Sequence, residues 1–156
     1  MRKISKFLIE LCSAYFVFIF LNAATINEIK VEGNSRVSDE TIKVYGDIRL
    51  KDNIDNKKIN EILNNLYSTD FFEDVKINEV NGVLNIIVKE YPLINQLIIN
   101  GEPSNRIKEE IKKQIFTKSK RSYVKSYLSN DVNLIKKLYS SIGYNFPNID
   151  VKIKEL

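Results

Sequence analysis

The residues that could carry chemistry in this chain are carboxylates, tyrosines and lysines, because its 156 residues include no histidine and one cysteine, Cys12. Without histidine there is no imidazole metal ligand, no Ser-His-Asp or Cys-His catalysis and no ordinary near-neutral general base. A single cysteine forms neither an intrachain disulfide nor a thiolate cluster. The composition therefore favours a non-enzymatic protein, and we expect no cofactor and no metal.

Four carboxylates and two tyrosines remain as candidates for catalysis. They are Glu73, Asp74, Glu79, Glu90, Tyr67 and Tyr139. The carboxylates lie on predicted strands or at their ends, where charged side chains are usually solvated, and an acid/base pair would need a cleft. The tyrosines end equivalent predicted helices and are expected to pack beneath a sheet. No Gly-rich phosphate loop, dinucleotide fingerprint or metal-ligand spacing is found in the sequence.

The first 23 residues have the three-part layout of a secretory signal peptide. Basic residues precede an apolar run, and small residues follow at Ala23 and Ala24. The apolar stretch 7–21 has 15 residues and contains Glu10, whereas a bilayer core needs about 20 apolar residues. This length favours a cleaved leader over a membrane anchor.

The charge balance argues against nucleic acid as a partner. Removing residues 1–23 takes away three basic residues and one acidic residue, so the formal net charge falls from +4 to +2. The densest basic stretch, 112–121, is interpreted as a solvated helix end. An RNA-binding KH module would also need a Gly-x-x-Gly loop, whereas Gly33 and Gly101 stand alone. We therefore expect no nucleic-acid binding.

After the leader, the pattern changes to alternating strands and helices. Ser38 and Asp55 are suitable helix N-caps, and Asn81-Gly82 predicts a type I′ hairpin because both residues of that turn need φ > 0. Apolar residues on both faces of the last strand predict that it is central in a sheet. The predicted elements are a strand over 26–34, helices over 38–46 and from Asp55 to Tyr67, and strands over 74–80 and 83–90.

The same element order begins again after Pro92. A shared segment supports an internal repeat: LYSTDFFEDVKI at 66–77 against LYSSIGYNFPNIDVKI at 138–153. The second copy lacks a third strand, so we expect an unfinished and less stable unit in a fragment of a longer protein. Its predicted elements are a strand over 93–102, helices from Ser104 or Asn105 and from Ser129 or Asn130, and a strand over 149–156. The predicted domains are a signal peptide over 1–23, a first unit over 24–92 and an incomplete second unit over 93–156.

Four motifs in this order resemble the periplasmic POTRA (polypeptide-transport-associated) repeats of the Omp85 superfamily. They are VEGN at 31–34, FFEDVKI at 71–77, the Asn-Gly hairpin and VKEYP at 88–92. The resemblance covers residues 26 to 156. It implies an α+β fold of tandem β-α-α-β-β units, each a three-stranded mixed sheet covered on one face by two helices. The implied strand order is first, third, second, which leaves the second strand at an edge.

The resemblance also implies a function. It is that of a non-enzymatic periplasmic module of the machinery that folds and inserts β-barrel proteins into the outer membrane of Gram-negative bacteria. The implied partners are unfolded outer-membrane β-barrel proteins and, in the full-length protein, periplasmic chaperones and assembly lipoproteins. The membrane would be reached through a C-terminal barrel that this chain lacks.

The predicted edge strand is the candidate binding site. Its unpaired backbone groups could accept an extended client segment by β-augmentation, which gives affinity with little sequence selectivity. Its alternation places polar residues on one face, while Val75 and Ile77 are expected to face the helices. The candidate site residues are Asp74, Val75, Lys76, Ile77, Asn78, Glu79 and Val80.

Two further classes of protein share parts of this architecture. Outer-membrane transporters of two-partner secretion or autotransporter assembly also combine a leader with POTRA repeats. A cell-division protein of the FtsQ kind has one such unit behind a true membrane anchor. The short apolar run and the second copy count against the latter.

Overall fold

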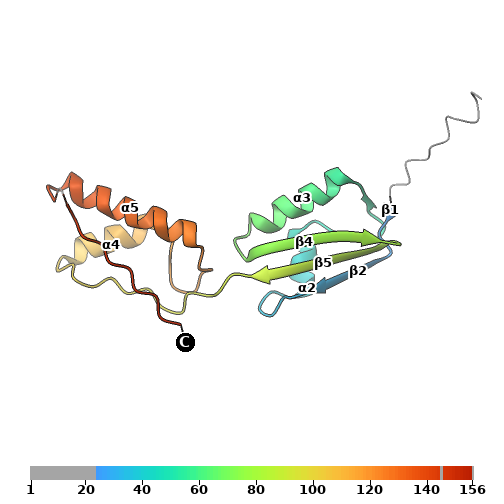
Figure 1. Ribbon diagram of the computed structural model, residues 1–156, viewed down its shortest axis with the longest axis horizontal. Coiled ribbons are helices and arrows are strands. Elements are labelled where there is room, and N and C mark those ends of the chain that lie inside the picture. The colour runs from blue at the N-terminus through green and yellow to red at the C-terminus, as the bar shows by residue number, and fades with distance from the viewer. Residues whose placement is uncertain (1–23, 145, 156) are drawn as a thin grey trace, which may run out of the picture.

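The computed structural model describes residues 24–144 and 146–155, so the predicted leader lies outside the described residues. The described chain is of the α+β class, with the strands gathered in the first unit (Figure 1). The elements are β1 (Ala24–Thr25), β2 (Glu28–Glu32), α2 (Asp39–Tyr45), β3 (Asn53–Ile54), α3 (Asn56–Tyr67), β4 (Phe72–Val80), β5 (Val83–Glu90), α4 (Asn105–Gln114) and α5 (Lys125–Ser141).

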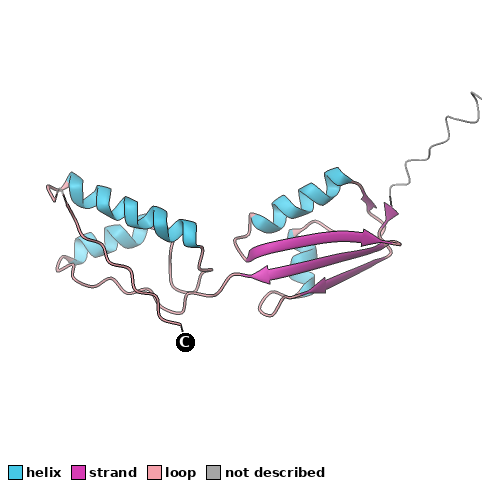
Figure 2. Cartoon of the chain, viewed as in Figure 1, coloured by secondary structure: helices cyan, strands magenta, loops and turns pink. Residues whose placement is uncertain are grey.

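The first unit is built on a three-stranded mixed sheet with the order β2-β5-β4. Strand β5 is central, parallel to β2 and antiparallel to β4, and Figure 2 shows the three strands side by side. The predicted order of first, third and second strand is confirmed. Strand β4 therefore lies at one edge of the sheet. A second, smaller sheet of β1 and β3, which the sequence pattern did not predict, pairs Ala24 with Ile54.

Helices α2 and α3 cover one face of this sheet. The core joins alternate residues of β5 to apolar residues of both helices, because successive strand side chains point to opposite faces. The buried cluster consists of Ile26, Ile42, Ile48, Ile54, Ile62, Leu66, Phe72, Val75, Leu84, Ile86 and Val88. The predicted burial of both faces of β5 is wrong, since Ile87 on the opposite face is 44% exposed. No helix covers that face among the described residues.

The helix caps and the hairpin turn of the first unit form as predicted. The Ser38 hydroxyl accepts a hydrogen bond from the N–H of Thr41, and the Asp55 carboxylate accepts one from Lys58. Asn81 and Gly82 have φ values of 55° and 80°, as the hairpin requires. Gly33 has a φ of 86°, and a Cβ there would lie 2.1 Å from the Val88 carbonyl oxygen. The close approach of two strands explains glycine in the VEGN motif.

The second unit forms its two helices but not its strands. Helix α4 is capped by Ser104, as predicted, whereas α5 begins at Lys125, before the predicted caps Ser129 and Asn130. The predicted strands over 93–102 and 149–156 are wrong for the described residues: only an isolated bridge joins Leu93 to Ser122. A strand needs a neighbour to satisfy its backbone groups, and no third strand lies between these segments in the described chain.

A side-chain hydrogen bond links the two units. The Tyr127 hydroxyl on α5 donates a hydrogen bond to the Asp70 carboxylate, 2.8 Å away, in the turn after α3. The Tyr127 ring also packs on Phe116, with ring centroids 5.6 Å apart. This hydrogen bond and burial raise the pKa of the Tyr127 phenol. The link joins the end of α3 to the start of α5.

Candidate functional site

All seven predicted site residues lie on β4, at the edge of the sheet. Val75 is buried and Ile77 is packed against the core, so both face the helices as expected. Lys76 and Asn78 are exposed on the opposite face. The pairing of Val75 with Val88 and of Ile77 with Ile86 fixes this register, because a one-residue slip would expose the apolar positions.

One backbone group on the open side of β4 is occupied. The Val75 N–H donates a hydrogen bond to the Tyr67 hydroxyl, 3.0 Å away, at the last residue of α3. The same hydroxyl lies 3.4 Å from a carboxylate oxygen of Asp74. Tyr67 is 42% exposed, so the expectation that it packs beneath the sheet is wrong. It reaches round the sheet edge because the helix ends beside β4.

Charged side chains follow the same edge. Lys76 lies 3.4 Å from Asp74, and Lys89 on the neighbouring strand lies 2.6 Å from Glu73. The hydrogen bond and charge of Glu73 raise the pKa of Lys89. Glu79 is not simply solvated, because its carboxylate accepts a 2.6 Å hydrogen bond from the Gly82 N–H in the hairpin turn. Charge along an edge strand is a common device against uncontrolled strand pairing.

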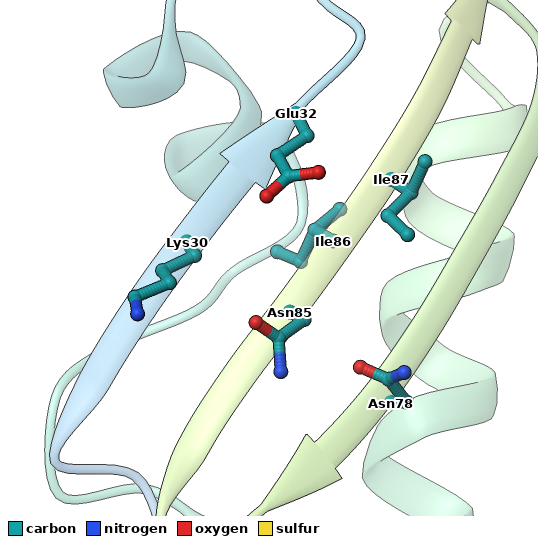
Figure 3. Close-up of a pocket in the computed structure, with 6 residues that line it drawn as sticks. All are labelled: Lys30, Glu32, Asn78, Asn85, Ile86 and Ile87. Atoms are coloured by element: carbon teal, nitrogen blue, oxygen red, sulfur yellow. The ribbon is translucent and has the colours of Figure 1, made fainter.

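The open face of the sheet carries a shallow hollow of about 240 Å³. Figure 3 shows Asn78 of β4 and Asn85 of β5 on neighbouring strands, and the two residues are paired in the sheet register. The lining residues are Lys30, Glu32, Asn78, Asn85, Ile86 and Ile87. The hollow combines amides, one charge of each sign and an exposed isoleucine, which are groups for contact rather than for bond making.

Glu90 holds the loop between β2 and α2 against the end of β5. Its carboxylate accepts hydrogen bonds from the N–H groups of Ser35, Arg36 and Val37 and lies 2.9 Å from the Arg36 guanidinium. Its side chain is 7% exposed, which corrects the expectation of a solvated residue. Burial raises the pKa of Glu90. The hydrogen bonds from the three N–H groups and the charge of Arg36 together lower this pKa by more than burial raises it, so the net shift is downward.

Three polar residues have structural roles that the sequence did not predict. These residues are Tyr67, Glu90 and Asp131. Asp131 is 2% exposed, and its carboxylate accepts hydrogen bonds from the N–H groups of Phe116 and Thr117 at 2.8 and 2.7 Å. A signal existed only for Tyr67, which the repeated Leu-Tyr-Ser segment aligns with Tyr139. The other two depend on partners 14 to 55 residues away in the chain.

Within the described residues, no group of three His, Cys, Asp or Glu side chains is arranged to hold a metal ion. Among the helices of that same part of the chain, none combines the length and the apolar character needed to cross a membrane. The arrangement around β4 offers backbone donors and acceptors, flanked by charge and two amides. Its chemistry is that of hydrogen-bonded binding.

The first unit matches a known protein family. Residues 24–91 match the POTRA family model, described as a surface antigen variable number repeat. The chain is 35% identical over 77 residues to the outer membrane protein assembly factor BamA of Neisseria meningitidis serogroup B, and 23% identical over 86 residues to BamA of Neorickettsia risticii. These matches span 49% and 55% of this chain but only 10% and 12% of the relatives.

A solved structure shows the same fold. It is the N-terminal domain of Omp85 from Thermosynechococcus elongatus, with a TM-score of 0.52 and 17% identity, and the match covers 78% of this chain and 53% of that one. This share exceeds what residues 24–91 alone supply, so the likeness extends into the second unit. Residues 24–91 thus match the POTRA family, and the described chain has the fold of that Omp85 domain.

Proposed function

We propose that this chain is a periplasmic, non-enzymatic module of an outer-membrane protein assembly factor. On this proposal residues 1–23 are a cleaved signal peptide, 24–92 the first POTRA unit and 93–156 a second POTRA unit. The family match of the first unit supports it, as do the two relatives named as outer membrane protein assembly factors. Unfolded β-barrel proteins are then the clients, with periplasmic chaperones and assembly lipoproteins as partners of the full-length protein.

The observation that carries the binding mode is the position of β4 at a sheet edge. An edge strand presents backbone N–H and C=O groups that no neighbour satisfies. An extended client segment supplies complementary groups at the same spacing, so it can add to β4 as a fourth strand. Residues 74–80 are therefore the proposed client-binding site. Main-chain recognition tolerates many sequences, which suits a module that handles many barrel proteins.

The test uses a synthetic ten-residue peptide with the alternating apolar and polar pattern of a barrel strand. It is titrated into the ¹⁵N-labelled protein, and backbone amide shifts are followed. We expect the shifts to concentrate in β4. Shifts confined to the helices, or no shifts at all, would reject the proposal.

A matched control isolates the main-chain contribution. A second peptide has the same sequence but carries N-methyl groups on its four central residues, so the side chains stay while the amide donors are lost. We expect its binding to fall by at least about tenfold, since several hydrogen bonds of about 1 kcal/mol each are removed. Equal binding of both peptides would mean that side chains, not strand addition, hold the client.

A further inference from the structure

The hydroxyl of Tyr67 occupies a hydrogen-bonding position that an added strand would need. It accepts the Val75 N–H at 3.0 Å and lies 3.4 Å from an Asp74 carboxylate oxygen. Asp74 in turn pairs with Lys76 at 3.4 Å. The amide, the phenol, the carboxylate and the ammonium group thus form one chain of polar contacts along β4. It begins at the edge itself.

The direction of the Val75 N–H identifies the other open groups. In an antiparallel pair, alternate residues direct both their N–H and C=O groups toward the neighbouring strand. Because the Val75 N–H points to Tyr67, it points away from β5, and the residues two and four positions later share this orientation. The outward groups of β4 are therefore those of Val75, Ile77 and Glu79. Only one of these outward donors, that of Val75, is bonded to the tyrosine.

We infer that Tyr67 is a register-setting residue of the client-binding edge: its hydroxyl competes with an added strand for the Val75 N–H and limits pairing to residues 77–80. This inference rests on the proposed function of β4. A client strand finds the outward groups of Ile77 and Glu79 open, then meets the phenol at Val75. For the client strand to pair with the Val75 N–H as well, the Tyr67 hydroxyl must leave this N–H. The exchange adds little binding free energy, because one hydrogen bond replaces another.

The position of Tyr67 suits such competition. The residue ends α3 and is 42% exposed, so its ring can turn toward solvent without opening the core. The buried members of the same helix, Ile62 and Leu66, are fully covered and hold the helix in place. A substitution at Tyr67 therefore changes the edge while the sheet and helices keep their packing.

The experiment compares the wild-type protein with Tyr67→Phe, using the same alternating ten-residue peptide and amide shifts. In the wild-type protein we expect shifts at residues 77–80 and none at the Val75 amide. In Tyr67→Phe the Val75 N–H loses its partner, so the shifts should extend to Val75. We expect Kd to fall about three- to tenfold, the equivalent of one hydrogen bond.

Two further variants separate the hydroxyl from other effects. Tyr67→Leu removes the ring as well and should resemble Tyr67→Phe; a gain seen only with leucine would assign the effect to the ring and overturn the inference. Tyr45→Phe is the matched control, because Tyr45 ends α2, is 50% exposed and makes no hydroxyl hydrogen bond among the described residues. It should leave Kd unchanged.

The outcomes distinguish this inference from the function on which it rests. Peptide binding at β4 with the same Kd and the same footprint in wild-type protein and Tyr67→Phe would overturn the role of Tyr67 and leave strand addition intact. A Val75 shift already present in the wild-type protein would do the same. Absence of β4 shifts in every variant would overturn both proposals. Unchanged hydrogen exchange of β5 amides verifies that each variant is folded.

Discussion

The first unit, residues 24–91, and the second unit, residues 93–155, each form two helices but differ in what satisfies the rest of their backbone. In the first unit every strand of the main sheet has a neighbour. In the second, two helices form, the start of segment 93–100 pairs only through the bridge from Leu93 to Ser122, and segment 149–155 has no strand partner in the described chain. Helices satisfy their hydrogen bonds locally, whereas strands depend on a second segment.

Burial follows the same division. Of the thirteen buried hydrophobic residues among those the structure describes, eleven lie in the first unit and two, Ile111 and Ile115, in the second. The apolar stripe of α5 has little to cover it, and its only buried residue is Asp131. A sheet therefore does more than pair strands: it provides the surface on which a helix buries its apolar face.

The largest expected difference between the units is in hydrogen exchange. Amides that exchange only by global unfolding are protected by the full stability, while unpaired segments open at almost no cost. We expect amides of β5 to exchange about a thousandfold or more slowly than those of 149–155. Hydrogen-exchange mass spectrometry measures this directly. Equal protection of both units in a monomer would show that the second unit has paired strands after all.

Shortening a buried side chain of the central strand β5 tests how far this strand stabilises the first unit. Leu84 is fully buried at the centre of the first unit, so Leu84→Ala should lower the free energy of unfolding of that unit by about 2–5 kcal/mol. Denaturant unfolding followed by β5 amides gives the value. Leu50→Ala, at a position that is 59% exposed, is the control and should change it by less than about 0.5 kcal/mol. A similar loss in both variants would mean that β5 does not organise the core.

The sequence predicted the parts of this fold that local chemistry determines. Ser38, Asp55 and Ser104 could be identified as caps because a cap bonds to an amide three residues away. The strand order of the first unit came from the family resemblance. The exposure of Ile87 was missed because an apolar pattern does not say whether anything covers a face. The role of Tyr67 depends on where α3 ends relative to β4, which no spacing rule provides.

An intermediate effect is expected at Glu90, which ties the β2–α2 loop to β5. Glu90→Gln removes the charge that three N–H groups and Arg36 stabilise, so the first unit should lose about 1–3 kcal/mol at pH 7. The pKa of Glu90 is lowered from 4.5 in the folded protein. Its contribution is therefore complete above pH 4.5 and disappears as the pH falls through the lowered pKa.

Denaturant unfolding of both proteins at several pH values tests this. The difference between wild-type protein and Glu90→Gln should be constant near neutrality and shrink below pH 4.5. Glu28→Gln is the control, because Glu28 is exposed on β2 and makes only a surface ion pair with Lys30. If the difference in stability between wild-type protein and Glu90→Gln did not depend on pH, the charge of Glu90 would not be its cause.

The smallest effect concerns the tyrosine of the second unit that the repeat aligns with Tyr67. Tyr67 bonds to a strand amide, but the equivalent partner of Tyr139 would be Val151, which is not in a strand. The Tyr139 hydroxyl instead donates to the Glu102 carboxylate. In the described chain no strand forms at Val151, and the two aligned tyrosines have different partners. Burial, followed by the hydrogen bond to Glu102, raises the pKa of Tyr139 to about 12.

The contribution of Tyr139 to stability is complete below its ordinary pKa of 10.0 and is lost as the pH rises toward about 12, because the unfolded chain releases the proton first. Ultraviolet titration should show one phenol ionising near pH 12, and that phenol should be absent in Tyr139→Phe. Glu102→Gln should lower the pKa of the Tyr139 phenol, because the Glu102 carboxylate accepts the hydrogen bond from the Tyr139 hydroxyl. The same hydrogen bond lowers the pKa of Glu102. The cost of Tyr139→Phe at pH 7 should be about 0.5–1.5 kcal/mol, confined to the second unit. An unchanged phenol titration in Glu102→Gln would show that burial alone holds the proton, and the contrast between the two tyrosines would then rest on the strand amide of Val75 only.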